Sequence, residues 1–215
     1  MSMTHARLTI PLSLLGCLCA MPAAAETPFF STGNPDGKIA TASRPKSAGK
    51  FEIESADDFV LTQETSITSA TFTGLLTGTN PTVGEVRVEI YRVFPNDSDT
   101  TRTPNVPTRA NSPSDVEFAD RDTSPSPGNL TFTTTELGSV SVLNSVQPGG
   151  IHPKPFQTTT GNGPLRGDEV GFDVNFTTPF VLPADHYFFV PQVTLTDGAQ
   201  FYWLSASRPI AGPGA

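Results

Sequence analysis

Histidine and serine carry much of the nucleophilic and acid–base chemistry of proteins, and in this sequence they do not occur in the patterns that such chemistry typically uses. A serine nucleophile is typically held in a Gly-x-Ser-x-Gly turn, and the chain contains no such pattern. After residue 25 the histidines are His152 and His186, without the His-x-His or His-x-x-x-His spacing typical of a zinc site. We predict that His152 is a solvated loop residue and that His186 is a turn residue bonded to a neighbouring carboxylate.

Carboxylates offer a second kind of chemistry, the binding of a hard cation. Asp97 and Asp99 cluster in one loop segment, and Asp120 and Asp122 follow further along the same insert. Calcium takes six to eight oxygen ligands, so these four aspartates are the predicted metal ligands, although the spacing lacks the glycine and terminal glutamate of an EF-hand loop. The alternative is a solvated acidic loop.

Adjacent carboxylates at Asp57 and Asp58 precede an apolar strand pattern. Adjacent residues of a strand point to opposite faces, so the two side chains do not share one catalytic cleft. We therefore interpret them as turn-closing or capping residues.

Aromatic side chains are the third class of candidate ligand-binding residue. Flat rings on an exposed face typically bind sugars, and Tyr187, Tyr202 and Trp203 are the predicted ligand-binding residues. Apolar residues on both faces of a strand are also typical of a buried core, so core packing is the alternative. Because side chains alternate along a strand, Tyr202 and Trp203 do not lie on the same face.

The elements that position these residues have a period of two. The segments 85–90 and 170–177 place apolar and polar residues in strict alternation, which predicts half-buried strands. Shorter strand patterns occur at 51–53, 59–61, 70–72, 130–132, 187–190, 192–195 and 201–204, and the irregular N-terminal stretch holds a further candidate at 39–43. The sequence thus predicts about nine strands, and Pro191 is expected to mark a strand end or an edge.

Helix-favouring patterns are scarce; Ser112–Phe118 could form one helical turn or a brief edge strand. Many short strands without alternating helices predict an all-β fold, a two-sheet antiparallel β-sandwich of jelly-roll or immunoglobulin-like type. Two long irregular loops, 95–128 and 144–168, interrupt the strands. In a sandwich, loops gather at the ends of the sheets, so these two are expected to share one rim.

The first 25 residues resemble a signal peptide: a mostly apolar run precedes Ala23-Ala24-Ala25, a small-residue cleavage pattern. Cys17 offers an alternative lipoprotein cleavage site. We expect one domain over 26–205, a Pro/Gly-rich tail over 206–215 with truncation of the chain there as an open alternative, and a secreted or cell-surface location. No transmembrane segment is expected in the mature chain.

Charge narrows the range of partners. The chain of 215 residues carries 13 Lys and Arg against 21 Asp and Glu, a formal net charge of −8. Nucleic-acid binding needs clustered basic residues, so this function class is disfavoured.

Three short motifs carry a resemblance to known proteins: Ser55–Leu61, Glu89-Ile90-Tyr91 and Tyr202-Trp203-Leu204-Ser205. They resemble a group of exported bacterial β-sandwich proteins with an Ala-Asp-Asp-Phe-x-Leu opening segment and a Tyr-Trp-Leu-Ser closing strand, some with C-terminal sorting anchors. The resemblance covers about 51–205 and implies a fold and a compartment, with no assigned chemistry. The end of this chain, Gly212–Ala215, departs from the anchored members.

These observations favour a non-enzymatic exported module that binds an extracellular polysaccharide or protein through its rim loops. A structural surface or matrix protein is the alternative. A secreted hydrolase that uses calcium is a third, less favoured hypothesis, and no cofactor other than calcium is suggested.

Overall fold

The computed structural model describes residues 28–47, 49–93, 117–147, 161–196 and 198–208, and these residues form β-strands without any helix. The strands are β1 (Pro35–Ala42), β2 (Asp57–Leu61), β3 (Thr65–Leu76), β4 (Val83–Arg92), β5 (Glu117–Asp122), β6 (Leu130–Val146), β7 (Gly163–Leu182), β8 (Asp185–Leu195) and β9 (Phe201–Ala206). The predicted all-β class is therefore confirmed. Within these ranges no helix has the length and apolar character needed to cross a membrane.

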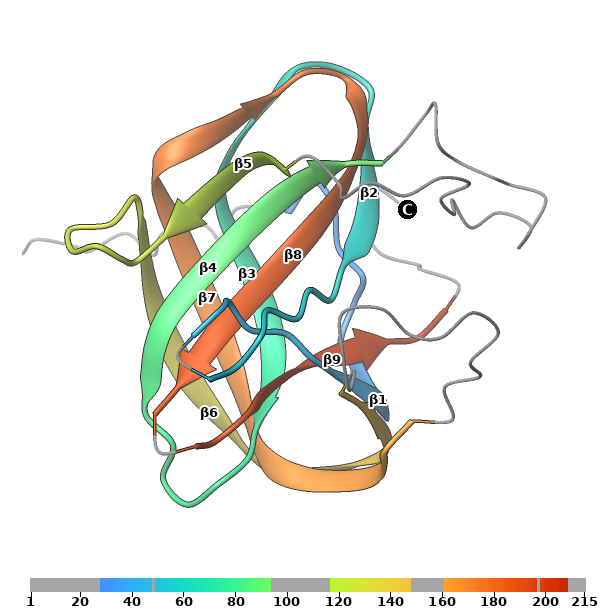
Figure 1. Cartoon of the computed structure of the whole chain (residues 1–215). Helices are drawn as coiled ribbons and strands as arrows, with labels where there is room; N and C mark the ends of the chain where they lie inside the picture. Colours follow the sequence, from blue (N-terminus) through green and yellow to red (C-terminus); the bar gives the residue numbers. More distant parts are fainter. Residues whose placement is uncertain (1–27, 48, 94–116, 148–160, 197, 209–215) are drawn as a thin grey trace, which may run out of the picture.

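Two sheets contain the nine described strands (Figure 1). One is a closed five-stranded barrel in the order β1-β6-β7-β3-β9, in which β9 returns to pair with β1. The other is a four-stranded sheet in the order β2-β8-β4-β5, and all its neighbours are antiparallel. In Figure 1, β4 and β8 lie side by side across the front of the molecule, with β5 and β2 at the two edges.

The segments with alternating apolar and polar residues form strands, as predicted. Val86, Val88 and Ile90 are buried on one face of β4. On β7 the four apolar residues at alternate positions from Val170 to Phe176 are also buried. Period-two alternation places every second side chain on the same face, so each strand contributes one apolar row to the core.

The main core joins the two sheets. One buried cluster contains apolar side chains of β2, β4 and β8 together with those of β3, β6, β7 and β9. Its centre is aromatic: the Phe72 and Phe172 rings stack with centroids 4.9 Å apart, and Phe201 packs edge-on against Phe172 at 5.6 Å. A second, smaller cluster contains Leu75 and Tyr202.

The structure differs from the predicted antiparallel sandwich in the way one sheet closes. β1 pairs parallel to β6, with Ile39 opposite Asn144, and antiparallel to β9. Thus β1 joins the two edges of an otherwise open sheet. Strand order has no local signature in the sequence, which is why period-two patterns predicted the strands and not the barrel.

Pro191 lies inside β8, where it pairs with Val88, so the predicted strand end is wrong. The pairing of β8 with β2 covers 185–189, so Pro191 lies beyond the reach of β2. Val193, two residues on, donates its N–H to Ser43 and away from β4. The nitrogen of Pro191 faces the same open side, where a missing N–H breaks no sheet bond.

The predicted irregular loops are shorter than the sequence suggested. β6 continues to Val146 and β7 begins at Gly163, so strands occupy both ends of the predicted 144–168 loop. The strand alternative for Glu117 and Phe118 is confirmed, since both belong to β5. Within the two predicted loops, residues 95–116 and 148–160 lie outside the described residues.

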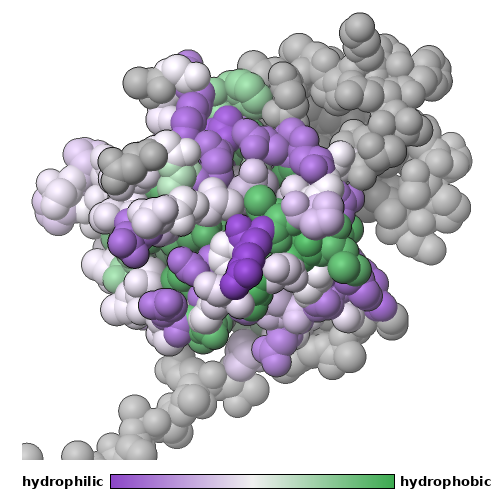
Figure 2. Space-filling view, turned by 90° about the horizontal axis from the view of Figure 1, so that it is seen from below, coloured by the Kyte–Doolittle hydropathy of each residue, from purple (hydrophilic) through white to green (hydrophobic). Residues whose placement is uncertain are grey.

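The lower face of the molecule has mixed polarity. In Figure 2 hydrophobic groups lie near the middle of this face among strongly hydrophilic ones. Single apolar side chains are exposed at Leu143 and Val181. Scattered exposed apolar residues are normal for protein surfaces and indicate no docking site on their own.

Candidate functional site

The outer face of the four-stranded sheet carries an unusual set of charges. Because Val86, Val88 and Ile90 point into the core, the alternate residues Glu85, Arg87, Glu89 and Tyr91 of β4 lie on the opposite face. That face is not simply solvated, since Glu89 is only 3% exposed.

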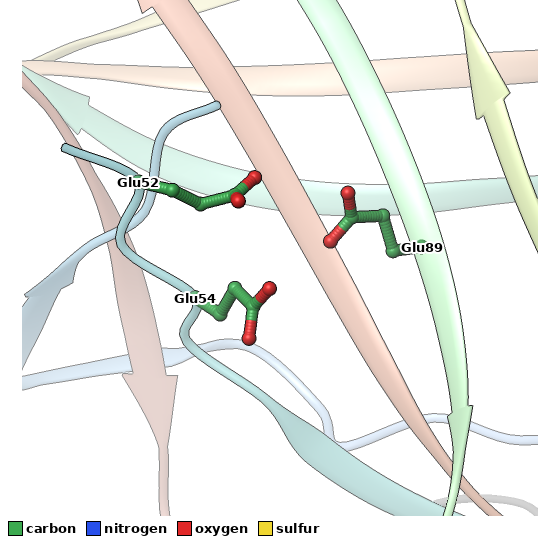
Figure 3. Close-up of side chains that lie close together, drawn as sticks. All are labelled: Glu52, Glu54 and Glu89. Atoms are coloured by element: carbon green, nitrogen blue, oxygen red, sulfur yellow. The ribbon is translucent and has the colours of Figure 1, made fainter. Parts of the chain in front are cut away.

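The chain segment between β1 and β2 packs over Glu89 and shields it from solvent. It folds back on itself through paired backbone hydrogen bonds between Arg44 and Ile53. Ile53 is buried in the smaller apolar cluster and anchors the segment, so the glutamates on either side of it are held in place. Glu52 and Glu54 therefore reach across β8 towards Glu89 (Figure 3).

Three carboxylates meet as a result. Glu52, Glu54 and Glu89 each offer one oxygen, and the three oxygens lie within 4.8 Å of one another. Exposure increases from the buried Glu89, through the half-buried Glu52, to the exposed Glu54. We call these three residues the glutamate cluster; it is open to solvent on the Glu54 side.

Polar neighbours of the glutamate cluster add oxygen atoms. The Tyr91 hydroxyl donates to Oε1 of Glu54 at 2.9 Å, and its oxygen also lies 3.4 Å from Oε2 of Glu89. The Gln192 amide Nε2 donates to Oε1 of Glu52 at 3.1 Å. Gln192 is fully buried, and its Oε1 has no hydrogen-bond partner among the described residues. A buried carbonyl oxygen without a donor is costly, and this one belongs to an amide that already contacts the glutamate cluster.

Arg87 lies beside the glutamate cluster, and its charge is mostly engaged elsewhere. Its guanidinium donates to Asp122 Oδ2 at 2.9 Å from Nε and forms an ion pair at 2.8 Å from Nη2. It also pairs with Glu85 at 3.2 Å and, more distantly, with Glu89 at 3.5 Å. One guanidinium is thus shared by three carboxylates.

The surrounding charges raise the pKa of several acids. Burial, together with the charges of Glu52, Glu117 and Glu54, raises the pKa of Glu89 to about 7 against the opposing effect of Arg87. Burial likewise raises the pKa of Glu117. The Tyr91 hydroxyl has a strongly raised pKa because it is buried among these carboxylates. At neutral pH the glutamate cluster is poised to hold either a proton or a cation.

The predicted aromatic ligand residues are largely part of the core. Tyr187 is fully buried, stacks on Phe59 at 5.7 Å and donates its hydroxyl to the Pro183 carbonyl. Tyr202 is 6% exposed. Tyr202 belongs to the smaller apolar cluster, whereas Trp203 packs against the main core, where its ring centre lies 6.2 Å from that of Phe189. Tyr202 and Trp203 therefore occupy different faces, as expected.

Two of the predicted metal ligands, Asp120 and Asp122, lie within the described residues, and both line one surface pocket beside Arg87. Asp97 and Asp99 lie outside these residues. Asp120 is exposed on β5, whereas Asp122 is nearly buried and accepts hydrogen bonds from Arg87 and from the Ser124 backbone. The oxygens of Asp122 are therefore engaged by protein donors.

The remaining sequence candidates contact residues that are distant in the sequence. Nε2 of His186 lies 2.7 Å from Oδ2 of Asp58, and the backbone N–H of His186 donates to Asp185. Asp57 pairs with Arg208. The His186 ring bonds a carboxylate, as predicted, but this carboxylate belongs to Asp58 of β2 and not to the neighbouring Asp185, and His186 lies in β8 rather than in a turn. His152 lies outside the described residues.

The glutamate cluster escaped sequence reasoning. The alternation at 51–54 and 85–90 predicted charged outer faces but carried no signal that one would cover the other. Searches of family models, of curated proteins and of solved structures find no match to the chain.

Proposed function

We propose that this protein is an exported, non-enzymatic binding module that holds a divalent cation, calcium in particular, at the glutamate cluster. The cation-loaded face would then contact an extracellular polysaccharide or protein. The observation that carries the proposal is the approach of three carboxylate oxygens within 4.8 Å, one of them from the buried Glu89. Like charges so close in a desolvated setting need a proton or a cation between them.

The donor chemistry favours calcium among cations. Every ligand offered by the glutamate cluster and its neighbours is an oxygen, which suits a hard cation rather than zinc or copper. The buried Oε1 of Gln192, whose Nε2 contacts Glu52, has no partner among the described residues and is a neutral carbonyl oxygen of the kind that calcium sites commonly include. The open side at Glu54 leaves room for water or for a partner's hydroxyl groups to complete the coordination.

The nearby guanidinium of Arg87 does not neutralise the site. Asp122 and Glu85 lie closer to Arg87 than Glu89 does. Asp122, Glu85 and Glu89 share this one guanidinium, while Glu52, Glu54 and Glu117 add further negative charge around Glu89. The excess negative charge attracts a divalent cation to this face.

Export, the sandwich architecture and partner binding through the rim loops stay part of this proposal. The core shared by the barrel and the four-stranded sheet supports a packed two-sheet arrangement of the jelly-roll or immunoglobulin-like kind. A bridging cation would allow an acidic exported module to bind partners that are themselves acidic or rich in hydroxyl groups. A partner bound by the loops at 94–116 and 148–160 is the alternative contact.

Thermal unfolding with and without calcium tests the cation site. At pH 8, calcium is expected to raise the Tm of the wild type; a cation at about 100 times its Kd stabilises a folded protein by about 2.7 kcal/mol. Glu54→Gln, at the open side, should abolish most of this shift without a large effect on folding. Glu136→Gln, an exposed glutamate on β6, is the matched control and should keep the shift. The absence of a calcium effect in the wild type, or equal effects in both variants, would exclude the site.

Affinity electrophoresis tests the binding function separately. A binding module should be retarded in gels that contain an acidic polysaccharide when calcium is present and should migrate freely when the cation is chelated. A structural scaffold predicts no retardation under either condition. Turnover of the polysaccharide that is lost in Glu89→Gln would replace this proposal with the hydrolase hypothesis.

A further inference from the structure

A buried arginine lies on the other side of the segment that carries the glutamates. Arg44 is only 8% exposed. Its Nη1 donates to Oε1 of Gln200 at 2.7 Å, its Nε donates to the Phe51 carbonyl at 3.2 Å, and the guanidinium lies 5.4 Å from the centre of the Phe51 ring. These neutral contacts orient the side chain without balancing its charge.

No carboxylate among the described residues forms an ion pair with Arg44. Burial lowers the pKa of Arg44, and the opposing influence comes from the neutral phenol of Tyr202. A buried cation is ordinarily paired because desolvation without a counter-charge is expensive. The charge of Arg44 is therefore unbalanced within the described part of the chain.

A small cavity adjoins this guanidinium. It has a volume of about 30 Å³ and is lined by Arg44, Lys50, Ser47, Thr194 and Gln200, with apolar and backbone groups completing the wall. Thr194 Oγ1 is buried and has no hydrogen-bond partner among the described residues. A cavity needs roughly 10–15 Å³ to hold one water, so this one has room for a small ion.

We propose that this cavity binds a small monovalent anion, either chloride or the carboxylate group of a small acid. Two cationic side chains, Arg44 and Lys50, border the cavity, and the unpartnered hydroxyl of Thr194 supplies a hydrogen-bond donor. A bound water would satisfy the hydroxyl and would bring no negative charge to the guanidinium, which has no carboxylate partner among the described residues, whereas an anion does both.

The anion cavity differs from the glutamate cluster in the charge of its ligand, and the two sites can be tested independently. Arg44 and Glu52 lie on the two arms of the same folded-back segment, which is joined by the bridges Arg44–Ile53 and Ser47–Lys50. An anion at Arg44 would fasten this segment to the turn that contains Gln200. Anion binding is measured without divalent cations, so it can succeed where the calcium proposal fails, and the reverse.

Chloride-35 NMR measures the anion directly. Wild-type protein in a calcium-free buffer is expected to broaden the chloride line, and added formate should remove the excess width by competition. Lys50→Met should reduce the part of the broadening that formate removes. Lys46→Met is the matched control, because it loses the same charge at an exposed residue that does not line the cavity.

Thr194→Val provides the sharpest distinction. If an anion accepts the hydroxyl's hydrogen bond, the variant binds chloride roughly tenfold more weakly, because a hydrogen bond to a charged group contributes about 1.4 kcal/mol or more. If the cavity has no anion, the variant loses only an unsatisfied hydroxyl and becomes as stable as the wild type or more so in every salt.

Each outcome decides the proposal. Formate that raises the Tm without any chloride broadening would assign the site to carboxylates, and broadening that formate removes would assign it to small anions in general. The proposal is wrong if wild-type protein gives neither effect, or if the Lys46 and Lys50 variants respond alike.

Discussion

At the residue scale, Glu89 shows how burial changes the role of a common side chain. Its strand neighbours make it look like a surface glutamate, yet it is 3% exposed and faces Glu52 and Glu54. Its pKa of about 7 means that the folded protein holds a proton there that the unfolded chain releases near pH 4.5. Folding and protonation are therefore linked at this residue.

The pH dependence of Glu89 gives a signed prediction. A raised folded-state pKa adds stability that is fully present below the unfolded value of 4.5 and is lost as the pH rises through about 7. In a chelator, wild-type protein should lose about 2 kcal/mol of unfolding free energy more than Glu89→Gln between pH 5 and pH 8. Urea unfolding at several pH values measures this difference.

Glu136→Gln serves as the control for that series, since Glu136 is exposed on β6. Its pH profile should follow the wild type. Parallel profiles for Glu89→Gln and the wild type would show that Glu89 is ionised throughout this range.

At the element scale, β7 organises the barrel. It runs for 20 residues and pairs along most of its length with both β3 and β6. Close packing against the neighbouring backbone requires glycine at one position. A Cβ atom at Gly167 would lie 2.3 Å from the backbone oxygen of Leu76, whereas a Cβ atom at Gly171 meets its nearest atom at 3.8 Å.

Alanine substitutions at these two glycines should therefore differ in their effect on stability. Gly167→Ala forces backbone atoms apart and should lower stability by about 1–3 kcal/mol, a typical cost of overpacking. Gly171→Ala, in the same strand, introduces only an ordinary contact and should be tolerated. Chemical denaturation of the two variants provides the comparison, and equal losses would contradict the close approach of β7 to β3.

The strands were predictable because their signal is local. The rows that begin at Val86 and Val170 depend only on alternation, and both formed as expected. The parallel pairing of β1 with β6 joins residues about 100 positions apart, and no local pattern specifies it. For the same reason the four aspartates and three aromatic residues proposed from the sequence differ from the glutamate cluster, which depends on contacts between Glu52 and a distant strand.

At the scale of the whole molecule, one apolar cluster joins the barrel to the four-stranded sheet. Phe172, at its centre, is 1% exposed and packs against Phe72, Phe132 and Phe201. Because the two sheets share this core, neither buries its apolar face without the other, and we expect them to unfold together.

Phe172→Ala tests this shared core. The cavity should cost about 3–5 kcal/mol, and fluorescence of Trp203, the single tryptophan, should change together with far-UV circular dichroism. Leu143→Ala, at a side chain that is 74% exposed, is the control and should change stability by less than about 0.5 kcal/mol. Two separate transitions would show that the sheets are independent units.

The position of β9 has a consequence for a shortened chain. β9 lies between β1 and β3, so a strand far along the chain fills the gap between two strands near its start. Without residues 201–206, β1 and β3 each present an unpaired edge, and open edges invite pairing with other chains. A fragment that stops before residue 201 should therefore aggregate where the full chain stays in solution.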